Sequence, residues 1–134
     1  MLHPAAEQLR AAGASLLHLQ EPALVAGNSG PSESSWPHLD RALRTLREGL
    51  DLRVVLHTYY GDAGPLLPRL RELPVDAVGV DLTQTDLESL RGPWSIGLLA
   101  GCLDGRSSLI ESVEATAGLA RRVAELAQPP LLLL

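Results

Sequence analysis

Carboxylate and aromatic side chains gather where the apolar runs of this sequence end. The run 54–56 is followed at once by His57, Tyr59, Tyr60 and Asp62, so two of the chain's four aromatic residues stand together. Three other apolar runs also end in acidic residues. The carboxyl ends of parallel strands lie along one rim, where α/β proteins place their chemistry. The sequence therefore predicts a binding rim made of Glu21, Tyr59, Tyr60, Asp62, Asp81, Asp104 and Arg106.

A metal site is the sharpest chemistry that these residues could support. Zinc binds His nitrogen, Cys sulfur and carboxylate oxygen, so His57, Asp81 and Cys102 could share one ion if they met in space. The pattern is weak because no two of them lie at short ligand spacing. A buried small hydrophobic role for Cys102 and a structural role for His57 are the competing interpretations. His3, His18 and His38 read as incidental. A serine hydrolase is disfavoured, because no G-x-S-x-G motif is present.

The elements that must position these residues alternate along the chain. Leucines 39, 43, 46 and 50 recur on one helical face. The short runs between such segments are apolar on both faces, as in a buried parallel sheet. The predicted helices span 4–14, 36–50, 64–74, 83–92 (capped by Thr83 or Thr85) and 108–127. The predicted strands span 15–20, 52–58, 75–82, 95–103 and 129–134.

Repeated βα units predict an α/β fold with a parallel sheet. A doubly wound sheet usually carries a glycine-rich turn after its first strand, and this sequence has none. A (β/α)₈ barrel is favoured, although it takes about 250 residues. We therefore expect residues 1–134 to form a single partial TIM barrel of about five strands, with a flexible loop at 26–35. The chain would be a fragment of a longer one, or would complete its sheet by self-association.

Composition excludes several classes of function. The net charge is −5 with pI near 5.3, and all eleven basic residues are arginines spread along the chain. Non-specific nucleic-acid binding needs a basic surface, so it is disfavoured. The terminal Leu-Leu-Leu-Leu is far shorter than the roughly 20 residues of a membrane span. A single cysteine and the lack of a signal-like start point to a reducing, cytoplasmic setting.

Four motifs resemble one known family. The segments QEPALV (20–25), TYYGD (58–62), LPVDAVGVDL (73–82) and LAGCLDGRSSLIE (99–111) occur in the order and at spacings similar to those of cobalamin-independent methionine synthase. The resemblance covers roughly residues 5–134 and is strongest to the N-terminal barrel. It implies bacterial methionine biosynthesis, with methyl transfer from methyltetrahydrofolate, usually a polyglutamate, to homocysteine. It also implies two related (β/α)₈ barrels, the C-terminal one catalytic and zinc-bound, the N-terminal one supporting the folate.

The resemblance carries over residue by residue. His57 falls on the histidine of the catalytic barrel's His-x-Cys zinc motif, Tyr59 falls on its cysteine, and Asp81 falls near its glutamate ligand. The last cysteine ligand would lie beyond Leu134. The resemblance therefore implies that zinc is absent here and that Tyr59 offers a stacking surface for a flat ring. Gln20 replaces the family's usual Asp before Glu-Pro, and Ser107 its Asn after Asp-Gly-Arg.

Two hypotheses follow for function. In the first, the chain is part of a methionine synthase or a short relative that supports folate without catalysing. Tyr59, Tyr60, Asp81, Asp104 and Arg106 would then bind the ligand, with Arg106 gripping a carboxylate. In the second, it is a non-catalytic binding or assembly module whose open sheet edges pair, most simply with another copy. A decarboxylase of the uroporphyrinogen type fits the motifs less well.

Overall fold

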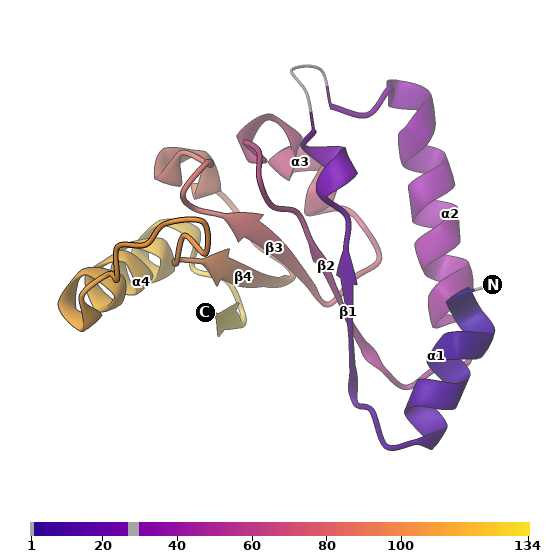
Figure 1. Cartoon of the computed structure of the whole chain (residues 1–134). Helices are drawn as coiled ribbons and strands as arrows, with labels where there is room; N and C mark the ends of the chain where they lie inside the picture. Colours follow the sequence, from indigo (N-terminus) through magenta and orange to yellow (C-terminus); the bar gives the residue numbers. More distant parts are fainter. Residues whose placement is uncertain (1, 27–29) are drawn as a thin grey trace.

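A computed structural model describes residues 2–26 and 30–134. Five parallel strands form one sheet in the order β1-β2-β3-β4-β5 (Figure 1). A doubly wound sheet reverses its strand order partway across, whereas a TIM barrel keeps sequential order. The predicted α/β fold and barrel-type topology are therefore confirmed. The strands are β1 (Leu16–Gln20), β2 (Arg53–His57), β3 (Ala77–Asp81), β4 (Gly97–Gly101) and β5 (Leu132–Leu133).

Helices alternate with these strands. The α-helices are α1 (Leu2–Ala11), α2 (Trp36–Arg47), α3 (Leu67–Leu70) and α4 (Val113–Ala127), and the 3₁₀ turns are η1 (Pro22–Leu24), η2 (Glu33–Ser35), η3 (Gly64–Leu66) and η4 (Leu87–Leu90). The predicted flexible loop at 26–35 falls partly on residues 27–29, which lie outside the described residues. Within the described ranges, no helix is long and apolar enough to cross a membrane.

The helix predictions located the elements but not their boundaries. The helix expected at 64–74, for example, is the 3₁₀ turn η3 followed by the four-residue α3, and two others differ for a clear reason. The helix expected at 83–92 is only the turn η4, capped by the Asp86 side chain rather than by Thr83 or Thr85. Thr85 is buried and its Oγ1 accepts the Ala63 N–H instead. The helix expected from 108 begins at Val113, because the Ser112 Oγ accepts the Ala115 N–H and sets the N-cap there. Residues 108–112 are an exposed loop.

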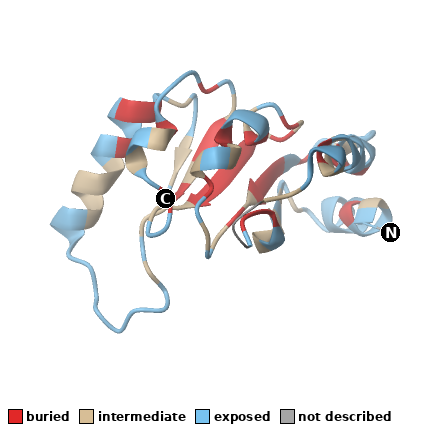
Figure 2. Cartoon of the chain, turned by 90° about the horizontal axis from the view of Figure 1, so that it is seen from above, coloured by how far each residue is buried: buried red, intermediate tan, exposed pale blue. Residues whose placement is uncertain are grey.

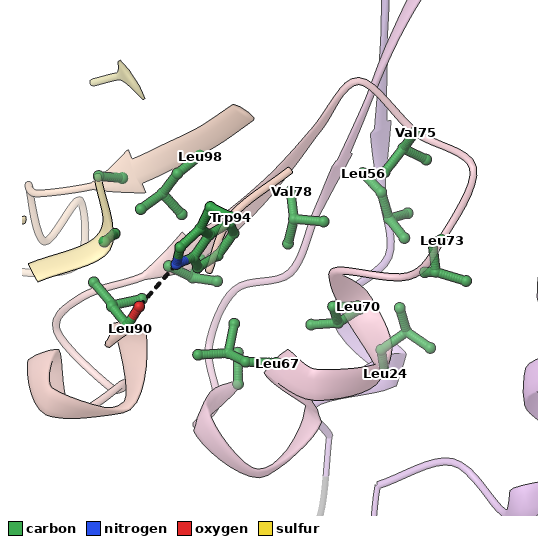
Figure 3. Packing of buried hydrophobic residues seen from close by; sticks show 14 of the residues in the cluster. Leu24, Leu56, Leu67, Leu70, Leu73, Val75, Val78, Leu90, Trp94 and Leu98 are labelled. Atoms are coloured by element: carbon green, nitrogen blue, oxygen red, sulfur yellow. Dashed lines mark hydrogen bonds between the residues drawn. The ribbon is translucent and has the colours of Figure 1, made fainter. Parts of the chain in front are cut away.

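One face of the sheet carries the main core, which we call the covered face. Leu56, Val78 and Leu98 of three neighbouring strands pack there against Leu70 of α3 and Val123 of α4. Figure 3 shows this cluster, in which the Trp94 indole donates a hydrogen bond to the Leu90 carbonyl (2.8 Å). The buried strands stand out beside the exposed outer sides of the helices (Figure 2).

The opposite face, which we call the open face, carries the alternate strand residues. Side chains alternate along a strand, so Leu16, His18 and Gln20 of β1 point away from the covered face, as do His57 and Asp81. Leu16 is 44% exposed and His18 and Gln20 are exposed as well. The polar residues predicted from strand ends therefore lie at the carboxyl-end margin of this face, whose central strand residues Val55 and Ala77 are buried.

Candidate functional site

Aromatic rings and one guanidinium form a chain along the carboxyl ends of the strands. The ring centroids of His57 and Tyr59 lie 5.5 Å apart, and those of Tyr59 and Tyr60 lie 4.7 Å apart, both edge to face. The Arg106 guanidinium lies 5.3 Å from the Tyr60 ring centroid, within cation–π range. Tyr60 is 64% exposed. Residues from the β2 and β4 ends thus build one accessible aromatic and cationic surface, which we call the rim cluster: His57, Tyr59, Tyr60 and Arg106.

Asp81 holds the loops beneath the rim cluster together. Its Oδ2 accepts the Tyr60 N–H (3.2 Å), and its Oδ1 accepts both the N–H (2.9 Å) and the hydroxyl (2.6 Å) of Thr83. Tyr60 has a φ of 66°, a left-handed conformation that costs energy in a non-glycine residue. Both carboxylate oxygens are therefore committed to fixing backbone, and Asp81 acts as a positioning residue for Tyr60.

Arg106 is fixed by two further contacts. Its Nε donates to Asp104 Oδ1 (2.9 Å), and its Nη2 donates to Thr83 Oγ1 (3.1 Å). The hydrogen bond from Arg106 lowers the pKa of Asp104, and the same pair raises the pKa of Arg106. Among the described residues, Nη1 has no hydrogen-bond acceptor. The guanidinium is therefore oriented by its neighbours while one nitrogen remains available to an anion.

His57 lies on the open face against a glycine. A Cβ on Gly79 would stand 2.4 Å from the His57 ring, so only glycine leaves space for the imidazole at that position. His57 Nδ1 shares a hydrogen bond with His18 Nε2 at 3.1 Å, and the two rings are stacked. Burial first, and then the neighbouring His18, lower the pKa of His57, while Asp81 acts in the opposite direction. The imidazole is therefore held in its neutral form near pH 7.

The suggested zinc ligands His57, Asp81 and Cys102 do not fit a common ion. The Asp81 oxygens are taken by Tyr60 and Thr83, and half-buried Cys102 packs against the core cluster of the covered face. Burial raises the pKa of the Cys102 thiol, which favours the protonated, non-ligating form. Across residues 2–26 and 30–134, no group of three or more His, Cys, Asp or Glu side chains is arranged to hold a metal ion.

Two predicted rim residues lie apart from the rim cluster. Asp62 is exposed, and its Oδ1 accepts the Gly64 N–H at 2.8 Å, so it closes the turn that leads into η3. Glu21 is half-buried and lines a cavity of about 270 Å³ together with Leu24 and Trp36. Position at the end of a strand therefore predicts which residues lie near the rim. It does not distinguish carboxylates that face a ligand from those that close a turn or line a pocket.

Sequence reasoning missed His18. A lone histidine within a strand gives no signal of a site by itself, yet His18 contacts His57 directly. The signal was present in the strand itself: Leu17 and Leu19 alternate with His18 and Gln20, which places both polar residues on the face opposite the leucines. Gln20 accepts a hydrogen bond from the Tyr59 hydroxyl (3.3 Å), which links β1 to the rim cluster as well.

Comparison of the sequence with known proteins identifies a family and several relatives. Residues 5–128 match the family described as cobalamin-independent synthase, N-terminal domain. The chain is 37% identical over 111 residues to 5-methyltetrahydropteroyltriglutamate–homocysteine methyltransferase of Mycobacterium tuberculosis H37Rv, covering 79% of this chain and 14% of that protein. The namesake enzyme of Streptococcus gordonii is 33% identical over 99 residues, covering 71% of this chain and 13% of that protein. The chain therefore spans about a seventh of the length of these relatives.

A solved structure shares the fold. The B12-independent methionine synthase of Shewanella sp. W3-18-1, determined in complex with selenomethionine, superposes with a TM-score of 0.73 at 20% identity, covering 98% of this chain and 43% of that one. Sequential parallel strands with a polar rim at their carboxyl ends define this chain as part of a TIM-type (β/α) barrel. It belongs to the cobalamin-independent methionine synthase family, in which it matches the N-terminal domain.

Proposed function

We propose that this chain supplies a folate-supporting surface of a cobalamin-independent methionine synthase and does not itself catalyse methyl transfer. The observation that carries the proposal is the rim cluster, in which exposed Tyr60 lies beside Tyr59 and under Arg106. A pterin is a flat ring suited to stacking on tyrosine. The relatives' names specify a pteroyltriglutamate, whose tail carries several carboxylates.

Arg106 is the residue assigned to the glutamate tail. Its Nε and Nη2 are held by Asp104 and Thr83, so the guanidinium need not be ordered again when a ligand binds. Nη1 then offers a charged hydrogen bond to a carboxylate. The adjacent Asp104 offsets the positive charge of Arg106. Binding of a glutamate carboxylate to Arg106 would therefore depend on hydrogen-bond geometry more than on long-range electrostatic attraction.

The same surface supports the proposed absence of catalysis. Tyr59 stands where the resemblance places a metal-binding cysteine, and the committed oxygens of Asp81 remove a second ligand. We propose that the homocysteine-activating chemistry of the named relatives lies outside these 134 residues, in the remainder of a longer chain or in a separate partner. The chain alone is expected to form no methionine from methyltetrahydrofolate and homocysteine.

Calorimetric titration of the full chain with methyltetrahydropteroyl-triglutamate and with its monoglutamate tests the proposal. Arg106→Ala is expected to weaken triglutamate binding by about tenfold or more, because hydrogen bonds to charged groups contribute roughly 1.5–3 kcal/mol. Its effect on the monoglutamate should be smaller. Tyr60→Ala should weaken both ligands by similar, several-fold amounts.

Arg44→Ala is the matched control for this experiment. Arg44 forms the same kind of exposed pair, donating from Nε to Asp40 at 2.8 Å, but it lies on α2 away from the rim. The Arg44→Ala variant should bind both ligands with the affinity of the unaltered chain. Equal losses in Arg44→Ala and Arg106→Ala, or no saturable binding to the unaltered chain, would refute the folate role.

A second candidate function rests on the open face. Leu16 on β1 and Leu131 beside β5 are 44% and 38% exposed, and β1 and β5 are the two edges of the sheet. Unpaired edges and apolar surface favour pairing with another chain. An assembly module would show a concentration-dependent dimer in sedimentation equilibrium that folate leaves unchanged. A monomer that binds folate supports the first proposal and excludes this one.

A further inference from the structure

His18 and His57 form a pair of metal-type ligands on the open face. His18 has no part in the proposed folate function, and His57 belongs to the rim cluster only through the edge-to-face contact of its ring with Tyr59. They come from neighbouring strands and sit diagonally, since His57 is paired in register with Gln20 and His18 with Val55. His18 Nε2 and His57 Nδ1 lie 3.1 Å apart. His18 is exposed and His57 is half-buried, so solvent reaches the pair from one side.

We propose that His18 and His57 together bind one divalent cation of the late first transition row. Imidazole nitrogen is a preferred ligand for such ions, Cu²⁺, Ni²⁺ and Zn²⁺ among them. Two nitrogens 3.1 Å apart, each about 2.0–2.1 Å from a shared ion, subtend an angle of roughly 98° at that ion. This angle suits two adjacent positions in square, octahedral or distorted tetrahedral coordination.

Binding a cation between two neutral imidazoles requires no release of a proton, only a change of tautomer in one ring. In the neutral pair one ring donates its N–H to the lone pair of the other. When the ion binds, the donor ring carries its hydrogen on its other nitrogen instead, so that both facing nitrogens offer lone pairs. The exposed His18 ring can turn to direct its lone pair, and water completes the coordination shell from the open side.

Two neighbours hold the ligand geometry. Gly79 leaves the space in which the His57 ring lies, because a Cβ there would come within 2.4 Å of it. The Tyr59 ring meets the His57 ring edge to face, with centroids 5.5 Å apart. Neighbours that fix the orientation of a ligating ring support metal binding. The site differs from the rejected combination of His57, Asp81 and Cys102, because it uses only one residue of that set.

Zn²⁺ alone, added to the full chain without folate, is the probe. Long-range ¹H–¹⁵N spectra report each imidazole nitrogen separately. We expect His18 Nε2 and His57 Nδ1 to shift together and saturate at one ion per chain, reversibly with chelator. Zn²⁺ should also raise Tm, because an ion held between β1 and β2 binds only the folded chain.

His18→Gln is the informative variant, because an exposed residue can change without loss of the fold. It should weaken Zn²⁺ binding by at least about tenfold, since even the loss of outer-shell partners costs that much in metal sites. His38→Gln, an exposed histidine on α2, is the matched control and should bind like the unaltered chain. The proposal is overturned if His3 or His38 takes up the ion instead, if binding does not saturate, or if His18→Gln binds equally well. Because Zn²⁺ is added without folate and the altered residue, His18, lies outside the rim cluster, each of these outcomes can be told apart from a failure of folate binding.

Discussion

The two faces of the sheet are built from the same strands but carry different kinds of residue. On the covered face, Leu56, Val78 and Leu98 are at most 2% exposed and pack under helices. On the open face, His18 is exposed and His57 is half-buried. Alternate residues of the same five-residue strands therefore serve different purposes on the two faces. The covered face supplies most of the apolar burial that stabilises the sheet. The open face buries Val55 and Ala77 at its centre and carries polar groups along β1 and at its carboxyl-end margin.

The largest effect should come from the covered face. Leu98→Ala removes a side chain that is 0% exposed, and truncations of this kind cost about 2–5 kcal/mol in unfolding free energy. Leu16→Ala, at a 44% exposed position of the open face, should cost less than about 1 kcal/mol. Urea denaturation followed by fluorescence of the buried tryptophans measures both. Similar losses at the two positions would contradict the division between the faces.

The next effect tests the tightest contact on the open face. Gly79→Ala places a Cβ against the His57 ring, and overpacking of this kind costs about 1–3 kcal/mol. Gly105→Ala is the control, because no atom lies within 4 Å of its added Cβ. If the clash with His57 is the cause, the double variant Gly79→Ala/His57→Ala should recover part of the loss. No recovery would place the strain in the backbone instead.

The fold was predictable because it depends on local patterns. Each of the five strands lies inside its predicted range, since short apolar runs between helical segments have few other structures available. Helix starts were harder, because they depend on single side chains. Ser112 begins α4 five residues later than the apolar pattern alone indicated, and Asp86 rather than a threonine caps η4.

The site was predictable only in outline. Strand ends located Tyr60, Asp81 and Arg106 on one rim, and the structure links them through hydrogen bonds and a cation–π contact. Their individual roles depend on partners far apart in sequence. Asp81 is committed to Tyr60 and Thr83, and His57 pairs with His18, 39 residues away. Patterns within one strand do not contain such pairings, so spacing alone suggested a different set of ligands.

An intermediate effect is expected at the margin between the two faces. Asp81→Asn replaces two acceptor oxygens by one, so either the Tyr60 N–H or the Thr83 contacts lose a partner. The expected loss is about 1–2 kcal/mol in unfolding free energy, with weaker folate binding because Tyr60 is no longer held at its left-handed φ. Asp62→Asn, which affects one exposed turn hydrogen bond, is the control. A folate affinity unchanged in Asp81→Asn would show that Tyr60 needs no such support.

The smallest effect is a pH dependence near neutral pH, to which His57 on the open face should contribute. Burial and His18 lower the pKa of His57 below its ordinary 6.5. The unfolded chain therefore binds this proton more readily than the folded chain, and stability rises with pH where the two states differ. The contribution of His57 is present above about pH 6.5 and is lost as the pH falls below that value.

Urea midpoints measured between pH 5 and 7.5 test this sign. The unaltered chain should lose stability on acidification through that window, and His57→Gln should lose less, because it has no imidazole to protonate. His38→Gln keeps the open face intact and should follow the unaltered chain. If the urea midpoint of His57→Gln changes with pH as steeply as that of the unaltered chain, the pH dependence belongs to other groups and not to His57.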